Sequence, residues 1–149
     1  EKGRLKGEYE VAFGQAKGRK RIRGDNRTPR GMYFVTSKYR GEFTGKYGAY
    51  YGGHWIKVNY PNAYDAQWGL ANKKLSSKTK RGIEAKWKQR KLTPQKTKLG
   101  GGIGFHGWIG PWSMKPDGAH LSWGCIVMHN HDIKKLFDQI PESTMVVVF

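Results

Sequence analysis

The sequence is short of several residue types, and each shortage excludes a class of protein. Its one cysteine, Cys125, excludes an internal disulfide framework and a zinc site built on paired cysteines. The longest plain apolar run, residues 145–149, is far too short to cross a membrane as a helix. Acidic residues number 11 against 28 Lys and Arg, so the formal net charge is +17. We therefore expect a strongly basic domain without disulfides or a membrane-spanning helix.

The excess of positive charge is accompanied by six Trp, eight Tyr and six Phe. A basic surface attracts polyanions such as nucleic acid, anionic lipid or an acidic wall polymer. Basic and aromatic side chains together suit single-stranded nucleic acid, but they also suit sugar and peptide polymers. Composition alone therefore leaves two interpretations open, an enzyme and a non-catalytic module that binds nucleic acid or acidic glycan.

The length of the chain predicts one domain over residues 1–149, because no linker divides it. The chain opens at Glu1 with charged residues and with neither an initiator Met nor a signal peptide. We therefore expect a processed or trimmed chain, and we expect it to be a monomer.

Short alternating runs and abundant glycine predict a mostly β fold, sandwich-like or barrel-like, with two helices. One helix is expected at 78–91 with Ser77 as its N-cap, and the other after Asn130, which would cap it. The expected strands cover residues 9–13, 32–37 and 56–60, with a buried strand at 144–149.

Residues 61–99 are the most basic and least strand-like part of the chain. Within them, Ile83 and Trp87 are spaced to face inward from a helix whose outer face is nearly all Lys and Arg. An insertion between strands is a natural lid or substrate wall, so we expect this segment to be one. Its charges form either a solvated face or a surface that holds an anionic polymer.

The only thiol of the chain stands in the run Trp123-Gly124-Cys125, downstream of the pair His106-Gly107. A thiol with a histidine available can be a nucleophile with its base. Gly124 permits a tight turn that aims the N–H groups of Trp123, Gly124 and Cys125 at one point, as an oxyanion hole requires. The Gly107 carbonyl can accept the N–H of the other ring nitrogen of His106 and so select its tautomer.

Other interpretations of these residues remain open. Cys125 can be a buried structural thiol, His106 can be a core histidine, and His120 is a rival base that lacks a following glycine. A metal site could combine Cys125 with His120, His129 and His131, but the carboxylates or paired cysteines that zinc recruits are missing at its usual spacings. We therefore expect no metal and no organic cofactor.

Four further residues are candidates for binding a substrate: Ser122, Tyr60, Asn62 and Trp108. Ser122 either forms hydrogen bonds within the site or caps the turn before the cysteine. Tyr60 and Asn62 are expected to shape a groove below the lid, although the proline between them also suits a structural turn. Trp108 either lines the groove or belongs to the core.

The order His106-Gly107, fifteen residues after His106, then Ser122-Trp123-Gly124-Cys125 resembles the signature of the L,D-transpeptidase catalytic domain (YkuD-type) family. That signature is a His-Gly or His-Ser pair, a spacer of similar length, and Ser/Thr-x-Gly-Cys. Three other segments resemble the family or one bacterial branch of it, and they extend the resemblance from Gly24 to Phe149: the hairpin Gly24-Asp25-x-Arg27-Thr28-Pro29-x-Gly31-x-Tyr33, Asn59-Tyr60-Pro61-Asn62-Ala63-x-Asp65, and Cys125-Ile126-Val127-Met128-His129-Asn130.

The resemblance implies a β-rich fold with the catalytic Cys and His at the mouth of a groove under a variable lid. It implies that Cys125 attacks the carbonyl of the L-centre of meso-diaminopimelate in a peptidoglycan tetrapeptide stem and that D-Ala leaves. An amine then takes the acyl group, which gives a cross-link or a D-amino-acid exchange, or water takes it, which gives an L,D-carboxypeptidase or cross-link hydrolase.

The same resemblance implies a location in the periplasm, the bacterial cell envelope or outside the cell. The expected partners are peptidoglycan stem peptides and other anionic envelope polymers, and not nucleic acid.

Many members have His or Asn where this chain has Trp123, and many have Arg where it has Val127. These departures bear on the acceptor and leave the nucleophile and base in place. If Cys125 is activated, we expect its alkylation well below a pH of about 8.5, where a free cysteine titrates.

Overall fold

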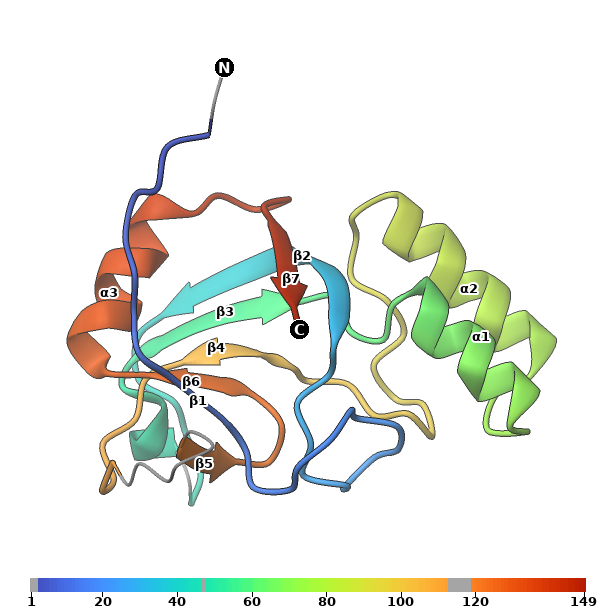
Figure 1. The fold of residues 1–149 in the computed structure, drawn as a ribbon, viewed down its shortest axis with the longest axis horizontal. Helices are drawn as coiled ribbons and strands as arrows, with labels where there is room; N and C mark the ends of the chain where they lie inside the picture. Colours follow the sequence, from blue (N-terminus) through green and yellow to red (C-terminus); the bar gives the residue numbers. More distant parts are fainter. Residues whose placement is uncertain (1–2, 47, 113–118) are drawn as a thin grey trace.

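The computed structural model describes residues 3–46, 48–112 and 119–149. Its seven strands form one mixed sheet in the order β5-β1-β6-β4-β3-β2-β7, which curls into a half-barrel (Figure 1). The strands are β1 (Val11–Gly14), β2 (Gly31–Arg40), β3 (His54–Val58), β4 (Gly104–His106), β5 (Ala119–Ser122), β6 (Ile126–Met128) and β7 (Met145–Val148). The helices within the described residues are α1 (Ala63–Ala71), α2 (Ser77–Lys88), α3 (Asn130–Gln139) and the short 3-10 helix η1 (Gly48–Tyr51).

The pairing of β4 with β6 in the middle of the sheet determines where the site forms. These two strands run parallel, with Phe105 opposite Ile126 and His106 opposite Val127. His106 is the last residue of β4, and Cys125 immediately precedes β6. Neighbouring parallel strands therefore bring together two residues that are far apart in the sequence.

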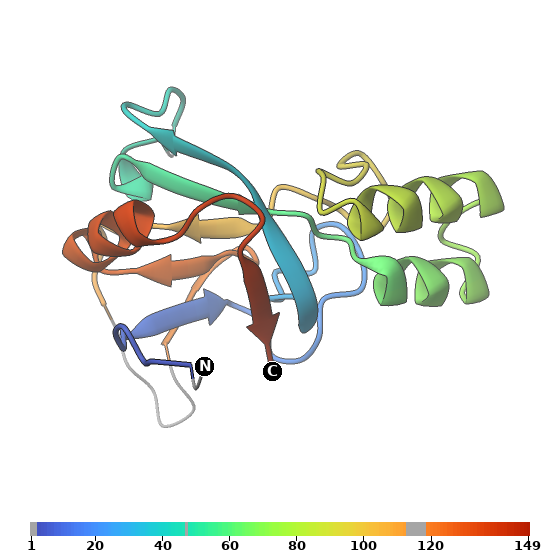
Figure 2. The ribbon, with the colours of Figure 1, turned by 90° about the horizontal axis from the view of Figure 1, so that it is seen from above.

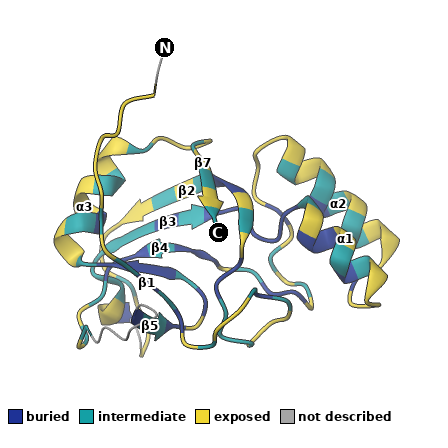
Figure 3. Cartoon of the chain, viewed as in Figure 1, coloured by how far each residue is buried: buried dark blue, intermediate teal, exposed yellow. Residues whose placement is uncertain are grey.

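Apolar side chains hold helices to the sheet in two places. Ile133 of α3 packs with Val35, Ile56 and Met128, so α3 covers one face of the sheet. The α1–α2 hairpin projects from one end of the sheet (Figure 2), and Ala66 of α1 and Ile83 of α2 are fully buried in the core. Buried residues follow the central strands and the base of this hairpin, whereas the outer faces of α2 and α3 are exposed (Figure 3).

The mostly β prediction is confirmed, but the helices differ from expectation in three ways. A helix that was not predicted, α1, follows Asn62, whose side chain caps it. In α2 the N-cap is Ser76, whose Oγ accepts a hydrogen bond from the N–H of Thr79 at 3.1 Å, so Ser77 is the first helical residue. In α3 Asn130 is already helical, and no side-chain hydrogen bond caps its start.

The C-terminal strand β7 is not buried, which corrects the expectation for residues 144–149. It lies at the edge of the sheet and pairs only with β2 there, so one of its faces meets solvent. Met145 and Val147 are about half exposed, at 52% and 47%. An apolar run of this kind indicates a strand, but it does not tell an edge strand from a central one. Among the described residues, no helix is long and apolar enough to cross a membrane.

Candidate active site

A cavity of about 690 Å³ opens beside the sheet, and both His106 and Cys125 lie on its wall. Aromatic side chains from η1 and from the loop after β4 form one part of the wall, while the segment 100–103 and the 20–26 loop form another. The sheet register explains this arrangement, since β4 delivers the imidazole and the turn before β6 delivers the thiol.

The imidazole of His106 is buried and held on several sides. Its Nδ1 lies 2.7 Å from the carbonyl oxygen of Gly107. A carbonyl can only accept, so Nδ1 carries the proton and Nε2 is the basic atom of the neutral ring. The ring stacks on Trp55 with centroids 5.6 Å apart and meets Tyr51 edge-on at 4.5 Å. These contacts fix both the tautomer and the orientation of His106.

The loop after His106 is anchored by backbone hydrogen bonds. The N–H of Gly107 donates to the carbonyl of Tyr51 at 3.0 Å, and the N–H of Trp108 donates to Oδ1 of Asn130 at 2.9 Å. A Cβ on residue 107 would lie 2.2 Å from Asn130 Oδ1, so any larger residue there would require the Asn130 side chain to shift. Asn130, which was expected to cap a helix, thus positions the Gly107 carbonyl that orients His106.

The turn before Cys125 is held by its own serine. Ser122 Oγ accepts from the N–H of Gly124 at 3.1 Å and donates to the carbonyl of Cys125 at 2.6 Å. Gly124 has φ +135°, and a Cβ there would lie 2.8 Å from the carbonyl oxygen of Arg27. Ser122 therefore closes the turn. The N–H of Gly124 already has an acceptor within the turn, which disfavours it as a donor to an oxyanion.

The electrostatics of the site favour a neutral thiol beside a neutral imidazole. Burial raises the pKa of the Cys125 thiol to about 11, although the Gly104 N–H and the Lys20 ammonium act to lower it. Burial also lowers the pKa of His106 to about 4, against the opposing effect of its hydrogen bond to Gly107. The thiol of Cys125 donates to the carbonyl of Gly102, with 3.5 Å between the sulfur and the oxygen. The pKa of Cys125 is therefore raised, whereas a thiol that is activated at rest has a lowered pKa.

This arrangement suits general-base catalysis rather than a preformed thiolate–imidazolium pair. A neutral His106 can accept the thiol proton at Nε2 while the sulfur attacks a carbonyl. Desolvation penalises the charged pair before substrate arrives, so proton transfer is coupled to the attack.

A family model described as the L,D-transpeptidase catalytic domain, YkuD, matches residues 1–148. The chain belongs to the YkuD family. The resemblance drawn from its motifs is thereby confirmed. No curated protein sequence matches the chain.

Two solved structures share the fold of this YkuD domain. Bd1075 from Bdellovibrio bacteriovorus is 25% identical with a TM-score of 0.53, and the match covers 95% of this chain and 37% of that one. The helical cell shape determining protein Pgp2 from Campylobacter jejuni is 26% identical with a TM-score of 0.53, over 93% and 36% of the two chains. This chain therefore spans little more than a third of the length of these proteins.

Of the predicted substrate-binding residues, Ser122 and Trp108 lie on the cavity wall, and Tyr60 and Asn62 are not among its lining residues. Tyr60 is fully buried and donates its hydroxyl to the carbonyl of Leu99 at 2.9 Å. Asn62 is fully buried at the start of α1. Both side chains hold the base of the helical hairpin, because their polar groups have acceptors or donors inside the protein.

The expected lid, residues 61–99, contributes one described residue, Gln95, to this wall. Its two helices lie in the projecting hairpin (Figure 1). The rival base, His120, lines a different cavity, where its Nδ1 lies 2.8 Å from the Gly14 carbonyl. Within residues 3–46, 48–112 and 119–149, no three His, Cys, Asp or Glu are grouped to hold a metal ion.

Sequence reasoning missed the residues that hold His106, which are Tyr51, Trp55 and Asn130. A signal was present in the run from Tyr50 to Trp55, where aromatics flank two glycines between expected strands. Such a run is typical of a turn that presents aromatic side chains to a ligand or a neighbouring loop.

We predict that Asn62→Ala lowers the free energy of unfolding by about 1–2 kcal/mol and leaves the cavity unchanged. Asn62 Oδ1 accepts from the N–H of Asp65 at 2.8 Å, and Asp65 Oδ2 accepts from the N–H of Asn62 at 3.1 Å. The substitution removes the first of these bonds and a third bond, from Asn62 Nδ2 to the carbonyl of Met32. Urea unfolding measures the loss, and the alkylation rate of Cys125 reports on the cavity.

The matched control is Asn72→Ala at the other end of the same helix. Asn72 is exposed and bonds only within α1, to the carbonyl of Trp68 at 2.8 Å, so its loss should cost less than about 0.5 kcal/mol. A structural role for Asn62 would be contradicted by an Asn62→Ala protein of unchanged stability whose Cys125 reacts at a different rate.

Proposed function

We propose that this YkuD domain is an L,D-transpeptidase that acylates Cys125 with a peptidoglycan tetrapeptide stem and passes the acyl group to an amine. The observation that carries the proposal is the pairing of two features on one cavity wall: the thiol of Cys125, and a His106 whose Nδ1 is bound to the Gly107 carbonyl. This pairing is what a cysteine acyltransferase needs, and a binding module does not require it.

In the acylation step, His106 Nε2 takes the thiol proton as Cys125 Sγ bonds to the carbonyl carbon at the L-centre of meso-diaminopimelate. The carbonyl oxygen becomes an oxyanion, which the N–H groups of Trp123 and Cys125 are proposed to stabilise. The intermediate collapses when the C–N bond breaks, and His106 returns its proton to the departing amine of D-Ala. The products of this half-reaction are free D-Ala and a thioester on Cys125.

In the second half-reaction, an amine enters the cavity and attacks the thioester carbon. His106 takes a proton from the amine, and the thiol of Cys125 is regenerated as the new amide forms. The side-chain amine of a second stem gives a cross-link, and a free D-amino acid gives exchange. Water in place of the amine would give the carboxypeptidase outcome from the same acyl-enzyme.

We further propose that the domain works in the periplasm or elsewhere in the cell envelope, on a polymer rich in carboxylates. Its formal net charge of +17 suits such a partner, since peptidoglycan stems carry several carboxylates. Pgp2 is a cell shape determining protein, and a role in cell shape is the corresponding proposal for this chain.

The test is incubation with a disaccharide-tetrapeptide, with and without an added D-amino acid, followed by mass spectrometry of the products. Transpeptidation predicts a dimer mass, and exchange predicts a mass in which the D-amino acid replaces D-Ala. Loss of D-Ala without either product would replace the transferase by an L,D-carboxypeptidase. An unchanged tetrapeptide, together with tight and salt-sensitive binding of single-stranded DNA, would favour the non-catalytic module instead.

A further inference from the structure

The charged side chains on the described part of the cavity wall are both cationic, Lys20 and Arg23. No Asp or Glu is among the described residues that line it. Tyr51 and Trp108, among other aromatics, line another part of the wall. A cavity with a cationic region and no described acid selects for an anionic group on its ligand.

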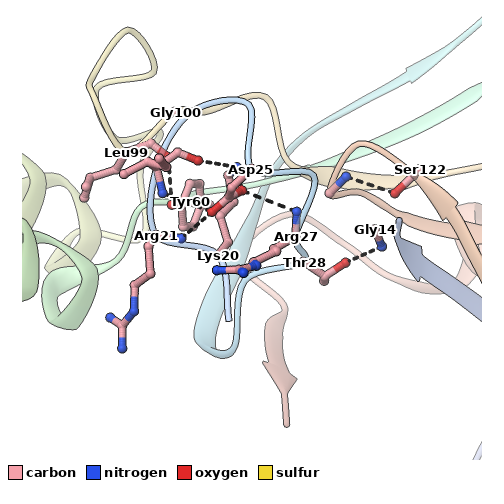
Figure 4. Close-up of polar contacts among 12 residues, drawn as sticks. Gly14, Lys20, Arg21, Asp25, Arg27, Thr28, Tyr60, Leu99, Gly100 and Ser122 are labelled. Carbon is pink, nitrogen blue, oxygen red and sulfur yellow. Dashed lines mark hydrogen bonds and ion pairs between the residues drawn. The ribbon is translucent and has the colours of Figure 1, made fainter. Parts of the chain in front are cut away.

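The Lys20 ammonium is part of a built and buried arrangement rather than a flexible surface charge. Only 4% of the Lys20 side chain is exposed, and Lys20 lies beside Asp25 (Figure 4), with 2.8 Å between its Nζ and Asp25 Oδ1. The Nζ also lies 3.0 Å from the carbonyl oxygen of Ile22. An ammonium has three N–H donors, and these two acceptors bind two of them. Lys20 lines the cavity, and its partner Asp25 is not among the lining residues.

Asp25 is held independently of Lys20, which preorganises the pair. Its carboxylate accepts from the backbone N–H groups of Arg21 at 2.7 Å, Ile22 at 3.1 Å and Arg27 at 3.3 Å. Burial acts to raise the pKa of Asp25, but these N–H groups and the Lys20 ammonium outweigh it and hold the pKa below its usual value. The loop therefore holds the Asp25 carboxylate in place, and this carboxylate fixes Lys20 at the cavity wall.

We propose that Lys20, assisted by Arg23, forms a subsite that binds the terminal carboxylate of the peptide substrate. The inference rests on the proposed function, because it takes the residue released from the substrate to be an amino acid with a free carboxylate. That carboxylate is separated from the attacked carbonyl carbon by only the amide nitrogen and one Cα. Lys20 and Cys125 line the same cavity, so a substrate bound at the thiol can also reach Lys20. An ion pair between this carboxylate and the Lys20 ammonium would select substrates whose C-terminal residue is the one that is released.

A first test uses two small alkylating reagents, iodoacetate and iodoacetamide, which differ in charge and react with Cys125 by the same displacement of iodide. Both consume the thiolate, so the ratio of their rates does not depend on the thiol pKa. Lys20→Met should lower the iodoacetate-to-iodoacetamide ratio by about tenfold, because it removes a cation close to the sulfur. Lys86→Met, on the exposed part of α2, is the matched control and should change the ratio by less than about twofold.

The Lys20→Met protein is expected to fold, since Asp25 keeps its three backbone donors, and circular dichroism checks this. If it does not fold, Arg23→Met replaces an exposed wall residue and should lower the ratio by about threefold. A ratio that stays within about twofold of wild type in the folded variants overturns the subsite.

A second test compares kcat/KM for a tetrapeptide with a free C-terminal carboxylate and for the same peptide with a C-terminal amide. Lys20→Met should lower kcat/KM for the free carboxylate about tenfold more than kcat/KM for the amide. Equal losses on both substrates would mean a structural role for Lys20 and would overturn the proposal. If wild type turned over neither peptide, the proposed function would fail, while the alkylation ratio would still decide whether Lys20 creates an anion site.

Discussion

Cys125→Ser is expected to lower kcat/KM for release of D-Ala from the tetrapeptide by at least about a thousandfold. Cysteine and serine differ by one atom. The turn around residue 125 is held by hydrogen bonds of Ser122 and Gly124, so the substitution leaves it in place. The hydroxyl is a much weaker nucleophile than the thiol, and a His106 with a pKa of about 4 is too weak a base to compensate. The measurement is steady-state release of D-Ala.

The control for this substitution is the fold of the variant, compared by circular dichroism and thermal unfolding. Because a serine hydroxyl can donate to the Gly102 carbonyl and accept from the Gly104 N–H as the thiol does, the melting temperature should change by only a few degrees. A serine variant that folds normally and keeps more than about a tenth of wild-type activity would mean that another group is the nucleophile.

His106→Gln has the second largest expected effect, a fall in kcat of about a hundredfold to ten-thousandfold. Glutamine can still donate an amide N–H toward the Gly107 carbonyl, but it has no basic atom to take the thiol proton. The pH profile of kcat/KM separates lost base catalysis from a lost contact. In wild type the neutral imidazole is the active form, so activity should persist below pH 6 and fall as the pH drops through about 4. The variant should lack this acid limb.

The matched control is His120→Gln, which changes the rival histidine on the other cavity and should alter kcat by less than about threefold. An acid limb near pH 6.5 in wild type would contradict the effect of burial on His106. A large loss in His120→Gln with normal activity in His106→Gln would exchange the roles of the two histidines.

The residues that carry the proposed chemistry could be predicted from the sequence because their requirements are local. His106 is followed by its carbonyl partner, Gly107, and Cys125 is preceded by the glycine of its own turn. Each of these pairs is formed by consecutive residues, so spacing alone suggests it. The mostly β class could also be predicted, since short alternating runs separated by glycine report directly on strands.

The environment of these residues could not be predicted, because distant segments provide it. Trp55 and Asn130 reach the His106 loop from β3 and α3, and nothing in their own sequence context indicates that contact. Burial is also a tertiary property, so the raised pKa of Cys125 and the lowered pKa of His106 could not be predicted from the sequence. An aromatic side chain such as Tyr60 suits a groove and a core equally well, so its sequence context does not separate the two.

The missed helix α1 has a different cause. Its sequence contains Gly69 and lacks a clear apolar stripe, so periodicity does not reveal it. The capping pair Asn62 and Asp65 is present in the sequence as a signal, but Asn62 also suits the groove to which it was assigned. Helix starts of this kind are better recognised from their caps than from their faces.

The central claim, that Cys125 carries the acyl group, is tested most directly by mass spectrometry of an acid-quenched reaction. Wild-type protein is mixed with excess tetrapeptide, quenched while D-Ala is being released, digested and analysed. The account predicts an adduct on the peptide that contains Cys125, with the mass of the substrate less D-Ala. An adduct of that mass on any other residue, or continued release of D-Ala after Cys125 has been fully alkylated, would contradict it.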